Sequence, residues 1–97
     1  MVAITPTIAQ KVSGLKVELK GDDAVLTWTN PANVKSIVIL HSNGTSTVEE
    51  AVATWSYGII DVNKDYFFTV KTKDVDGNLS LGETVYLRRE GPEAVKN

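Results

Sequence analysis

The chain has 97 residues, the size of a single domain, and a chain of this length buries roughly 65% of its unfolded surface on folding. Ten basic and twelve acidic residues give a net charge of −2, so the sequence carries no electrostatic signature of a nucleic-acid or anionic-membrane partner. There is no cysteine, and no apolar run approaches the ~20 residues of a membrane span. We therefore expect one domain without disulfides, nucleic-acid binding or membrane insertion.

The two ends of the chain are expected to lie outside the core. Residues 1–11 contain a proline and scattered small residues, which indicates a lead-in linker. The first residues lack the charged region and the long apolar core of a signal peptide, so in a secreted parent Met1 would begin an excised segment. Glu90-Gly91-Pro92 stops the last strand, and residues 90–97 are expected to form a C-terminal linker. The predicted domain spans residues 12–89.

Two strands are predicted at the start of this domain. Apolar and charged side chains alternate in the first strand, and the apolar side consists of Leu15, Val17 and Leu19. A turn at residues 21–23 leads to a second strand, whose larger apolar face consists of Ala24, Leu26 and Trp28. Asn30-Pro31 ends this strand because proline has no N–H to donate to a ladder.

The next two strands form a predicted hairpin. Residues 37–40 are apolar on both faces, so periodicity alone leaves open which set points inward. Asn43-Gly44 lies between two β-type runs and is the strongest short hairpin signal. Residues 45–52 are therefore expected to pair back onto residues 37–40, with Glu49-Glu50 on a solvent-exposed edge.

Three further strands complete the predicted sandwich. Residues 55–59 alternate, and Gly58 is expected to mark a bulge. Residues 65–74 form the longest β-type run, and its inward face consists of Tyr66, Phe68, Val70 and Thr72. A turn at residues 75–78 precedes the closing strand at residues 84–88. This pattern, without an amphipathic helix, predicts an all-β antiparallel sandwich.

The order and spacing of several short motifs resemble a fibronectin type III domain over residues 12–89. The motifs are Gly14-Leu15-Lys16-Val17, Leu26-Thr27-Trp28-Thr29-Asn30-Pro31, Ile60 six residues before Tyr66, Tyr66-Phe67-Phe68-Thr69-Val70, and Asp74-Val75-Asp76-Gly77-Asn78-Leu79-Ser80. The sequence departs from the family pattern at Val62-Asn63, where Pro-Gly is usual, and at Ile37, where a tyrosine is expected. No Arg-Gly-Asp triplet is present, so integrin binding of the animal type is not expected.

The resemblance implies a seven-stranded antiparallel immunoglobulin-like sandwich, with Tyr66 as a tyrosine corner whose hydroxyl bonds to backbone near Ile60 and Asp61. It also implies that Ile37 and Ile39 point inward. The expected core comprises Leu15, Val17, Leu26, Trp28, Ile37, Ile39, Ile60, Tyr66, Phe68, Val70 and Val85. Bacterial members occur in secreted or surface-anchored proteins, often beside carbohydrate-active domains, so we expect an extracellular or cell-surface location.

No catalytic site assembles from the sequence. The single histidine, His41, lies just before a hairpin turn, and no second histidine is present for a nucleophile–base relay. Asp22-Asp23 and Glu49-Glu50 are pairs of adjacent carboxylates, which face opposite ways along a strand and do not converge on one substrate. We therefore expect neither enzyme activity nor a cofactor.

The segment from Asp74 to Asn78 has an alternative interpretation as a calcium loop, because oxygen ligands crowd a glycine-bearing turn. A full calcium loop needs about twelve residues and a terminal bidentate glutamate. Glu83 lies nine residues past Asp74, which is short of that spacing. A hairpin turn in which Gly77 and Asn78 accept positive φ explains the same residues. We favour the turn and expect no metal.

The outward face of one sheet is the first candidate binding surface. If Ile37 and Ile39 point inward, three neighbouring strands present a mainly apolar face that consists of Val38, Leu40, Phe67, Thr69 and Tyr86. Monomers rarely leave such a patch bare. Scattered surface apolarity, or cover by the stems of Lys71 and Arg88, would explain the same residues without a partner. Our hypothesis is that this face contacts a neighbouring domain or another protein.

Trp55 and Tyr57 are the second candidates, because aromatic side chains at strand spacing can form a platform for sugars. The resemblance turns their face inward, so a core role is favoured. The alternative is a carbohydrate-binding platform made of Trp55, Tyr57 and Tyr86.

These observations favour a non-catalytic interaction or spacer module of a larger secreted or cell-surface bacterial protein. A small carbohydrate-binding module is the alternative. An engineered binding scaffold ranks last, because residues 30–36 and 74–80 lack the Tyr- and Ser-rich composition of such surfaces. We expect the isolated domain to be a monomer.

Overall fold

A computed structural model describes residues 9–61 and 63–87. Most of the predicted lead-in, Val62, Arg88 at the end of the predicted closing strand and the predicted C-terminal linker at residues 90–97 lie outside the described residues. Residues 9–11 contact the sandwich, since Ala9 is buried and the Gln10 carbonyl accepts a hydrogen bond of 2.6 Å from Thr72 Oγ1. Within the described ranges, no helix is long and apolar enough to cross a membrane.

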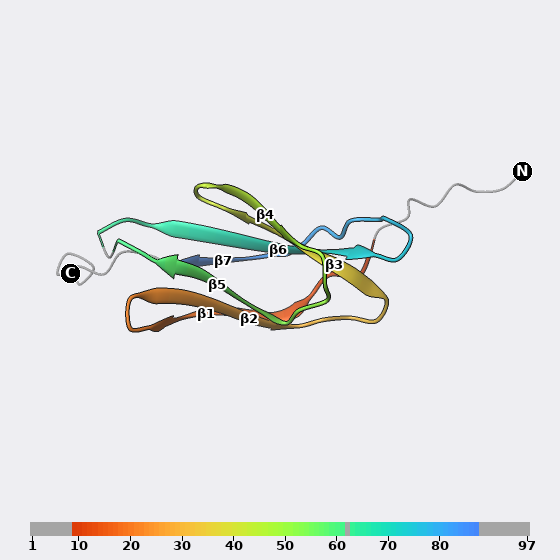
Figure 1. Cartoon of the computed structure of the whole chain (residues 1–97), viewed down its shortest axis with the longest axis horizontal. Helices are drawn as coiled ribbons and strands as arrows, with labels where there is room; N and C mark the ends of the chain where they lie inside the picture. The colour runs from red at the N-terminus through yellow and green to blue at the C-terminus, as the bar shows by residue number, and fades with distance from the viewer. Residues whose placement is uncertain (1–8, 62, 88–97) are drawn as a thin grey trace, which may run out of the picture.

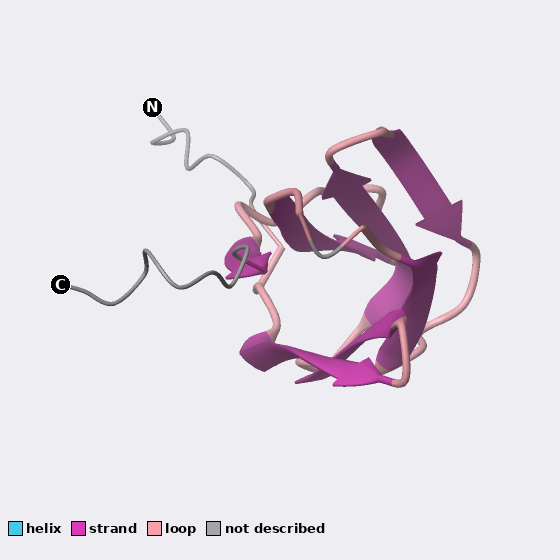
Figure 2. Ribbon diagram, turned by 90° about the vertical axis from the view of Figure 1, so that its left-hand side faces the viewer, coloured by secondary structure: helices cyan, strands magenta, loops and turns pink. Residues whose placement is uncertain are grey.

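The described residues form seven strands in two antiparallel sheets (Figure 1). The strands are β1 (Ser13–Lys20), β2 (Asp23–Thr29), β3 (Val34–His41), β4 (Gly44–Val48), β5 (Thr54–Ile59), β6 (Tyr66–Asp74) and β7 (Glu83–Leu87). One sheet has the order β1-β2-β5 and the other has the order β4-β3-β6-β7. Figure 2 shows the two sheets as facing layers. The predicted fold class, an all-β antiparallel immunoglobulin-like sandwich, is confirmed.

Alternation along the strands places the core between the two sheets. Ile37 and Ile39 are fully buried, which decides the face that periodicity left open in β3. All of the expected core residues belong to one hydrophobic cluster, and those at its partly buried margin are Val17, Tyr66 and Val85. Trp28 and Phe68 lie within the cluster on opposite sheets, so the central strands β2 and β6 both contribute to it.

Two features of the core were not predicted. Val12, which precedes β1, is among the largest fully buried side chains. Leu19 was expected on the buried side of β1, and this expectation was wrong because 47% of its surface is exposed. Leu19 lies on the edge strand β1, whereas its directly opposite partner Ala24 lies on the central strand β2 and is fully buried.

The predicted hairpin and bulge are both present. His41 pairs with Gly44 across a two-residue turn, so β4 pairs back onto β3, although it ends at Val48 rather than at residue 52. In the β2–β5 ladder, Ala24 pairs with Gly58 and Val25 pairs with Ser56. This register shift leaves one extra residue on β5, as expected for a bulge at Gly58.

Two polar side chains fix the ends of neighbouring elements. The Tyr66 hydroxyl accepts a hydrogen bond of 2.9 Å from the Asp61 N–H, which is the expected tyrosine corner. Trp28 Nε1 donates to Asn30 Oδ1 at 2.9 Å, and Asn30 Nδ2 donates to the Val52 carbonyl at 2.9 Å. Asn30 therefore ties the end of β2 to the segment that leads into β5.

Ser80 continues the β6 ladder before β7 begins. Its Oγ accepts the Thr72 N–H at 2.9 Å, and its own N–H donates to the Thr72 carbonyl at 2.9 Å. Both residues are buried, so no water replaces these bonds when one partner is lost.

Replacement of Ser80 by alanine is expected to lower the free energy of unfolding by about 1–3 kcal/mol, because the buried Thr72 N–H is left without an acceptor. Urea denaturation measures this change. Ser56→Ala is the matched control, since Ser56 is exposed on β5 and its loss should change stability by about 0.5 kcal/mol or less. Equal effects in the two variants would contradict the assignment.

Candidate functional site

Strand register places the five predicted face residues on one side of the β4-β3-β6-β7 sheet. Leu40 lies opposite Thr69, and Phe67 lies opposite Tyr86. Val38 lies opposite Lys71, one residue pair from the buried Ile37 and Ile39. Residues directly opposite each other in an antiparallel ladder share a face, and successive residues alternate between faces. The five side chains therefore point away from the core, on the outer face of this sheet.

Exposure along this outer face is uneven. Tyr86 is 59% exposed and Phe67 is 37% exposed, whereas Val38, Leu40 and Thr69 are half-buried. Thr69 Oγ1 lies 2.7 Å from Thr84 Oγ1, so a hydrogen-bonded hydroxyl pair occupies the middle of the face. The apolar exposure is concentrated at the end of the face where Phe67 and Tyr86 lie side by side.

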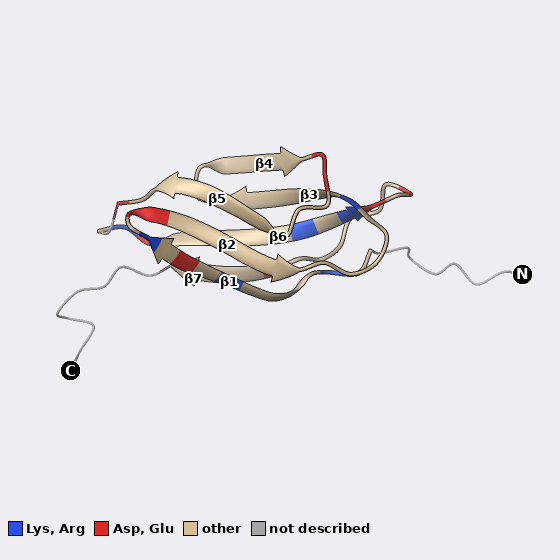
Figure 3. Ribbon diagram, turned by 60° about the horizontal axis from the view of Figure 1, so that its bottom comes forward, with Lys and Arg blue, Asp and Glu red and all other residues tan. Residues whose placement is uncertain are grey.

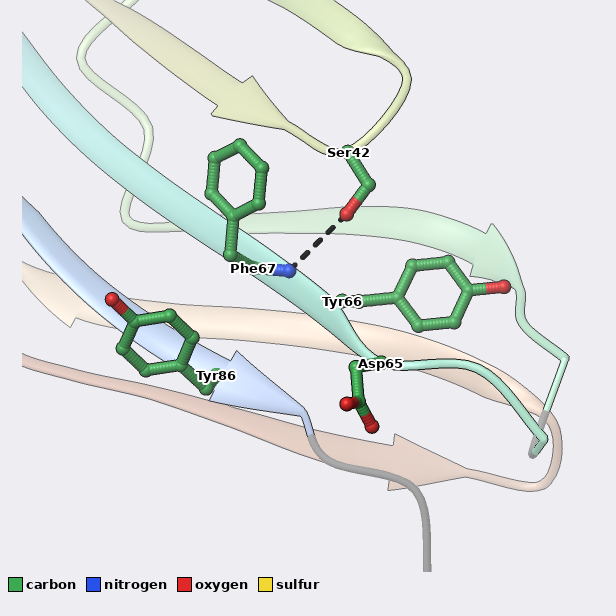
Figure 4. Close-up of a pocket in the computed structure, with 5 residues that line it drawn as sticks. All are labelled: Ser42, Asp65, Tyr66, Phe67 and Tyr86. Atoms are coloured by element: carbon green, nitrogen blue, oxygen red, sulfur yellow. Dashed lines mark hydrogen bonds between the residues drawn. The ribbon is translucent and has the colours of Figure 1, made fainter.

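A hollow of about 230 Å³ lies at this end of the face (Figure 4). It is lined by Ser42, Asp65, Tyr66, Phe67 and Tyr86. Ser42, in the β3–β4 turn, accepts the Phe67 N–H on its Oγ at 3.3 Å. The ring of Tyr66 stacks with the buried Phe68 at a centroid distance of 6.4 Å, so it belongs to the opposite face of β6. The solvent-facing side chains of the hollow are therefore two aromatic rings, a carboxylate and a hydroxyl.

Ser42 and Asp65 were not predicted as parts of this hollow. Asp65 precedes Phe67 by two residues, so the period of a strand places both on one face. That signal was available, but a lone acidic residue at a strand start is usually a turn residue. Ser42 reaches the hollow only through the β3–β6 pairing, which no local pattern encodes.

The structure does not bring Trp55, Tyr57 and Tyr86 together, which corrects the expected sugar platform. Trp55 and Tyr57 lie on β5 of the three-stranded sheet and pack against the core. The Tyr57 ring meets the ring of Phe68 edge-on at 5.3 Å, and Trp55 stacks on His41 at 5.7 Å. Tyr86 points outward from the other sheet, so the three side chains share no common face.

His41 has a structural place in the β3–β4 hairpin. Its Nδ1 accepts the Asn43 N–H at 3.3 Å, which leaves Nε2 as the protonated nitrogen in the neutral ring. Nε2 lies 3.1 Å from Ser46 Oγ and can donate to it. Among the described residues, no group of three histidine or acidic side chains is arranged to hold a metal ion.

The carboxylate of Asp74 organises the β6–β7 turn. Its Oδ1 accepts the N–H groups of Asp76 and Asn78, each at 2.9 Å, and its Oδ2 accepts Asn78 Nδ2 at 3.3 Å. The Asn78 N–H is the largest cause of a lowered pKa of Asp74, and the other donors of the turn add to it. The same oxygens that a calcium ion would need are thus engaged within the turn.

The lowered pKa of Asp74 predicts a pH dependence of stability. Because this pKa is lower in the folded chain than its ordinary value of 3.8, the carboxylate stabilises the fold above that value. The contribution is lost as the pH falls through the folded-state pKa. We expect the Asp74→Ala variant to have a lower free energy of unfolding at neutral pH. Between about pH 5 and pH 2, its free energy of unfolding, measured by urea denaturation at each pH, should fall less steeply than that of the unmodified chain.

Asp76→Ala is the matched control for this titration, since Asp76 is an exposed neighbour that bonds to Asp74 through its backbone N–H, which the substitution retains. The prediction would be contradicted if the stability of the Asp74→Ala variant fell as steeply with decreasing pH as that of the unmodified chain.

The strand order, the β3–β4 hairpin and the tyrosine corner between β5 and β6 define an immunoglobulin-like sandwich. Within that class the chain has a fibronectin type III fold, as the sequence resemblance implied.

Solved structures show the same fold at low sequence identity. A fibronectin type III domain of human collagen XX superposes with a TM-score of 0.59 and 19% identity, over 88% of this chain and 100% of that chain. The spore cortex lytic enzyme SleM of Clostridium perfringens gives a TM-score of 0.67 and 14% identity, over 80% of this chain and 27% of SleM. Pectate lyase Pel3 of Pectobacterium carotovorum gives 0.63 and 14%, over 90% of this chain and 28% of Pel3.

The chain therefore spans about a quarter of the length of each of these two enzymes. No protein-family model and no curated protein sequence matches it.

Proposed function

We propose that this domain is a non-catalytic interaction and spacer module of a larger secreted or cell-surface bacterial protein. The observation that carries the proposal is the position of the two ends of the described chain, which lie at opposite ends of the sandwich. A module of this shape holds the domains on either side of it apart.

The pairing of the strands establishes these positions. Ser13, at the start of β1, pairs with Thr29 at the end of β2. Leu87, at the end of β7, pairs with Tyr66, whose hydroxyl bonds to the Asp61 N–H. The neighbouring Ile60 N–H donates to the carbonyl of Asp22, which lies in the turn of the β1–β2 hairpin. Leu87 therefore lies near this turn, at the opposite end of the hairpin from Ser13 and Thr29. In Figure 1 the red start of the described chain and the blue tip of β7 lie accordingly at opposite ends.

The charge distribution and the structural neighbours support the same role. Figure 3 shows acidic and basic residues dispersed over several strands and turns. The ion pair Lys16–Glu18, at 3.9 Å, is solvent-exposed, and the pair Lys11–Glu83, at 3.2 Å, joins an exposed lysine to a half-buried glutamate. The likeness to SleM and Pel3 covers a small part of each enzyme. A domain that covers so small a part of an enzyme can be an accessory domain beside a polysaccharide-processing domain.

The spacer role is tested by placing the full chain between two copies of a small folded domain, each carrying one spin label. The chain has no cysteine, so thiol labels attach only to the flanking domains. We expect a distribution of label–label distances that is much narrower than that of a Gly/Ser linker of equal length, which behaves as a random coil. A distribution as broad as that of the linker would refute the spacer role.

A further inference from the structure

The hollow beside Phe67 and Tyr86 combines two kinds of surface. Phe67 on β6 and Tyr86 on β7 are directly opposite in the ladder, and both rings are exposed on the outer face. Figure 4 shows the two side chains rising from neighbouring strands, with Ser42 and Asp65 at the adjoining strand ends. An aromatic pair in register offers a flat apolar contact of fixed spacing, because two antiparallel strands hold both rings.

The polar groups of the hollow lie at the rim of this aromatic pair. Ser42 Oγ accepts the Phe67 N–H, so its own hydroxyl hydrogen remains to be donated to a ligand. The Asp65 carboxylate adds acceptor oxygens, and the Tyr86 hydroxyl is both donor and acceptor. The lining thus offers donors and acceptors beside an apolar surface.

We propose that this hollow binds one neutral pyranose ring of a polysaccharide chain. A pyranose has apolar C–H faces for the aromatic rings and a rim of hydroxyl groups for Ser42, Asp65 and Tyr86. The hollow, about 230 Å³, is below the roughly 300–1,000 Å³ of pockets that hold drug-sized ligands, so it accommodates a single ring.

The net charge of the chain favours a neutral sugar over an anionic one. This charge is −2, so a uronate would bring a further negative charge to a chain that is already acidic overall. The Thr69–Thr84 hydroxyl pair further along the face also suits a neutral polyhydroxyl chain better than an apolar peptide.

This inference assigns a ligand to one end of the outer face and does not depend on the spacer role. The spin-label distances can show a rigid spacer while sugar binding is absent. Sugar binding can likewise be observed in a chain that is not a rigid spacer.

The test is an NMR titration of the full ¹⁵N-labelled chain with neutral hexasaccharides of glucose, xylose and N-acetylglucosamine, and with hexagalacturonate as the anionic control. We expect at least one neutral hexasaccharide to shift the amide signals of Ser42, Phe67 and Tyr86. Because only one sugar ring occupies the hollow, the Kd should be about a millimolar. Hexagalacturonate should leave these signals unchanged at the same concentration.

Two variants locate the site. Tyr86→Ala and Phe67→Ala should each weaken binding by about tenfold or more, as expected for an aromatic anchor. Tyr86→Phe should retain most of the affinity, because it keeps the ring. Ile59→Ala is the matched control, since Ile59 is 77% exposed on β5 of the other sheet and should bind as the unmodified chain does.

Three outcomes would overturn the proposal. They are no amide shift with any neutral sugar, shifts that map away from the hollow, and unchanged affinity of a Tyr86→Ala variant whose spectrum shows it to be folded. In the first of these outcomes, shifts of the same amides by a cationic peptide would assign the hollow to a protein partner instead.

Discussion

Truncation of Phe68 to alanine is expected to lower the free energy of unfolding by about 3–5 kcal/mol, the largest single effect that we predict for this chain. Phe68 is fully buried in β6, where it pairs with His41 on one side and Val85 on the other. Its ring also contacts the ring of Tyr57 across the sandwich at 5.3 Å. The alanine variant loses these contacts and leaves a cavity between the two sheets. Urea denaturation of the two proteins measures the difference.

Phe67→Ala is the control for this truncation, because it removes the same side chain from the neighbouring position of β6. Phe67 lies on the outer face and is 37% exposed, so its loss should cost about 1 kcal/mol or less through its pair with Tyr86. The two variants thus separate the two faces of one strand. Similar losses of stability in both would show that β6 is not oriented as described.

Replacement of Gly82 by alanine is the second large effect, with an expected loss of about 2–5 kcal/mol. Gly82 has a φ of +86°, where a side chain costs about 1–2 kcal/mol. A Cβ at this position would also lie 2.8 Å from Lys71 Cγ and 3.1 Å from the Val70 carbonyl oxygen, which is part of the β6 backbone. Such overpacking adds roughly 1–3 kcal/mol, since the backbone has to shift.

Gly77→Ala separates the two contributions to this loss. Gly77 has the same φ of +86°, but no atom outside its chain neighbours lies within 4 Å of the point that a Cβ would occupy. Its replacement should therefore cost only the conformational part, about 1–2 kcal/mol. The difference between the two variants in urea denaturation measures the close approach of residue 82 to β6. If Gly77→Ala were as destabilising as Gly82→Ala, the steric contribution would be absent.

The strands were predictable because their side chains alternate against a common core. In β6, Phe68 and Val70 are buried while Phe67 and Lys73 are exposed, as a period of two requires. The hairpin was equally local, because Asn43-Gly44 between two β-type runs signals a turn, although the two residues of the turn are Ser42 and Asn43. The periodicity of β3 was uninformative, and only the family resemblance placed Ile37 and Ile39 inside.

The remaining features depend on contacts between residues distant in sequence. Thr72 Oγ1 donates to the carbonyl of Gln10, and the hollow forms where Ser42 meets Phe67. Neither contact leaves a local pattern, because each joins residues that are far apart in the chain. The uneven exposure of the outer face has the same origin: Leu40 is half-buried by its neighbours across the sheet, whereas Tyr86 lies on an edge strand with a neighbour on one side only.

The opposite positions of the two ends of the described chain also determine how the domain responds to tension. A force that pulls the two ends apart draws β1 lengthwise along β2, and β7 lengthwise along β6. The hydrogen bonds of these antiparallel ladders run perpendicular to the strands, so the force loads many of them in shear at once instead of opening them one by one. We therefore expect the fold to resist such a force more strongly than a fold whose ladders open one hydrogen bond at a time.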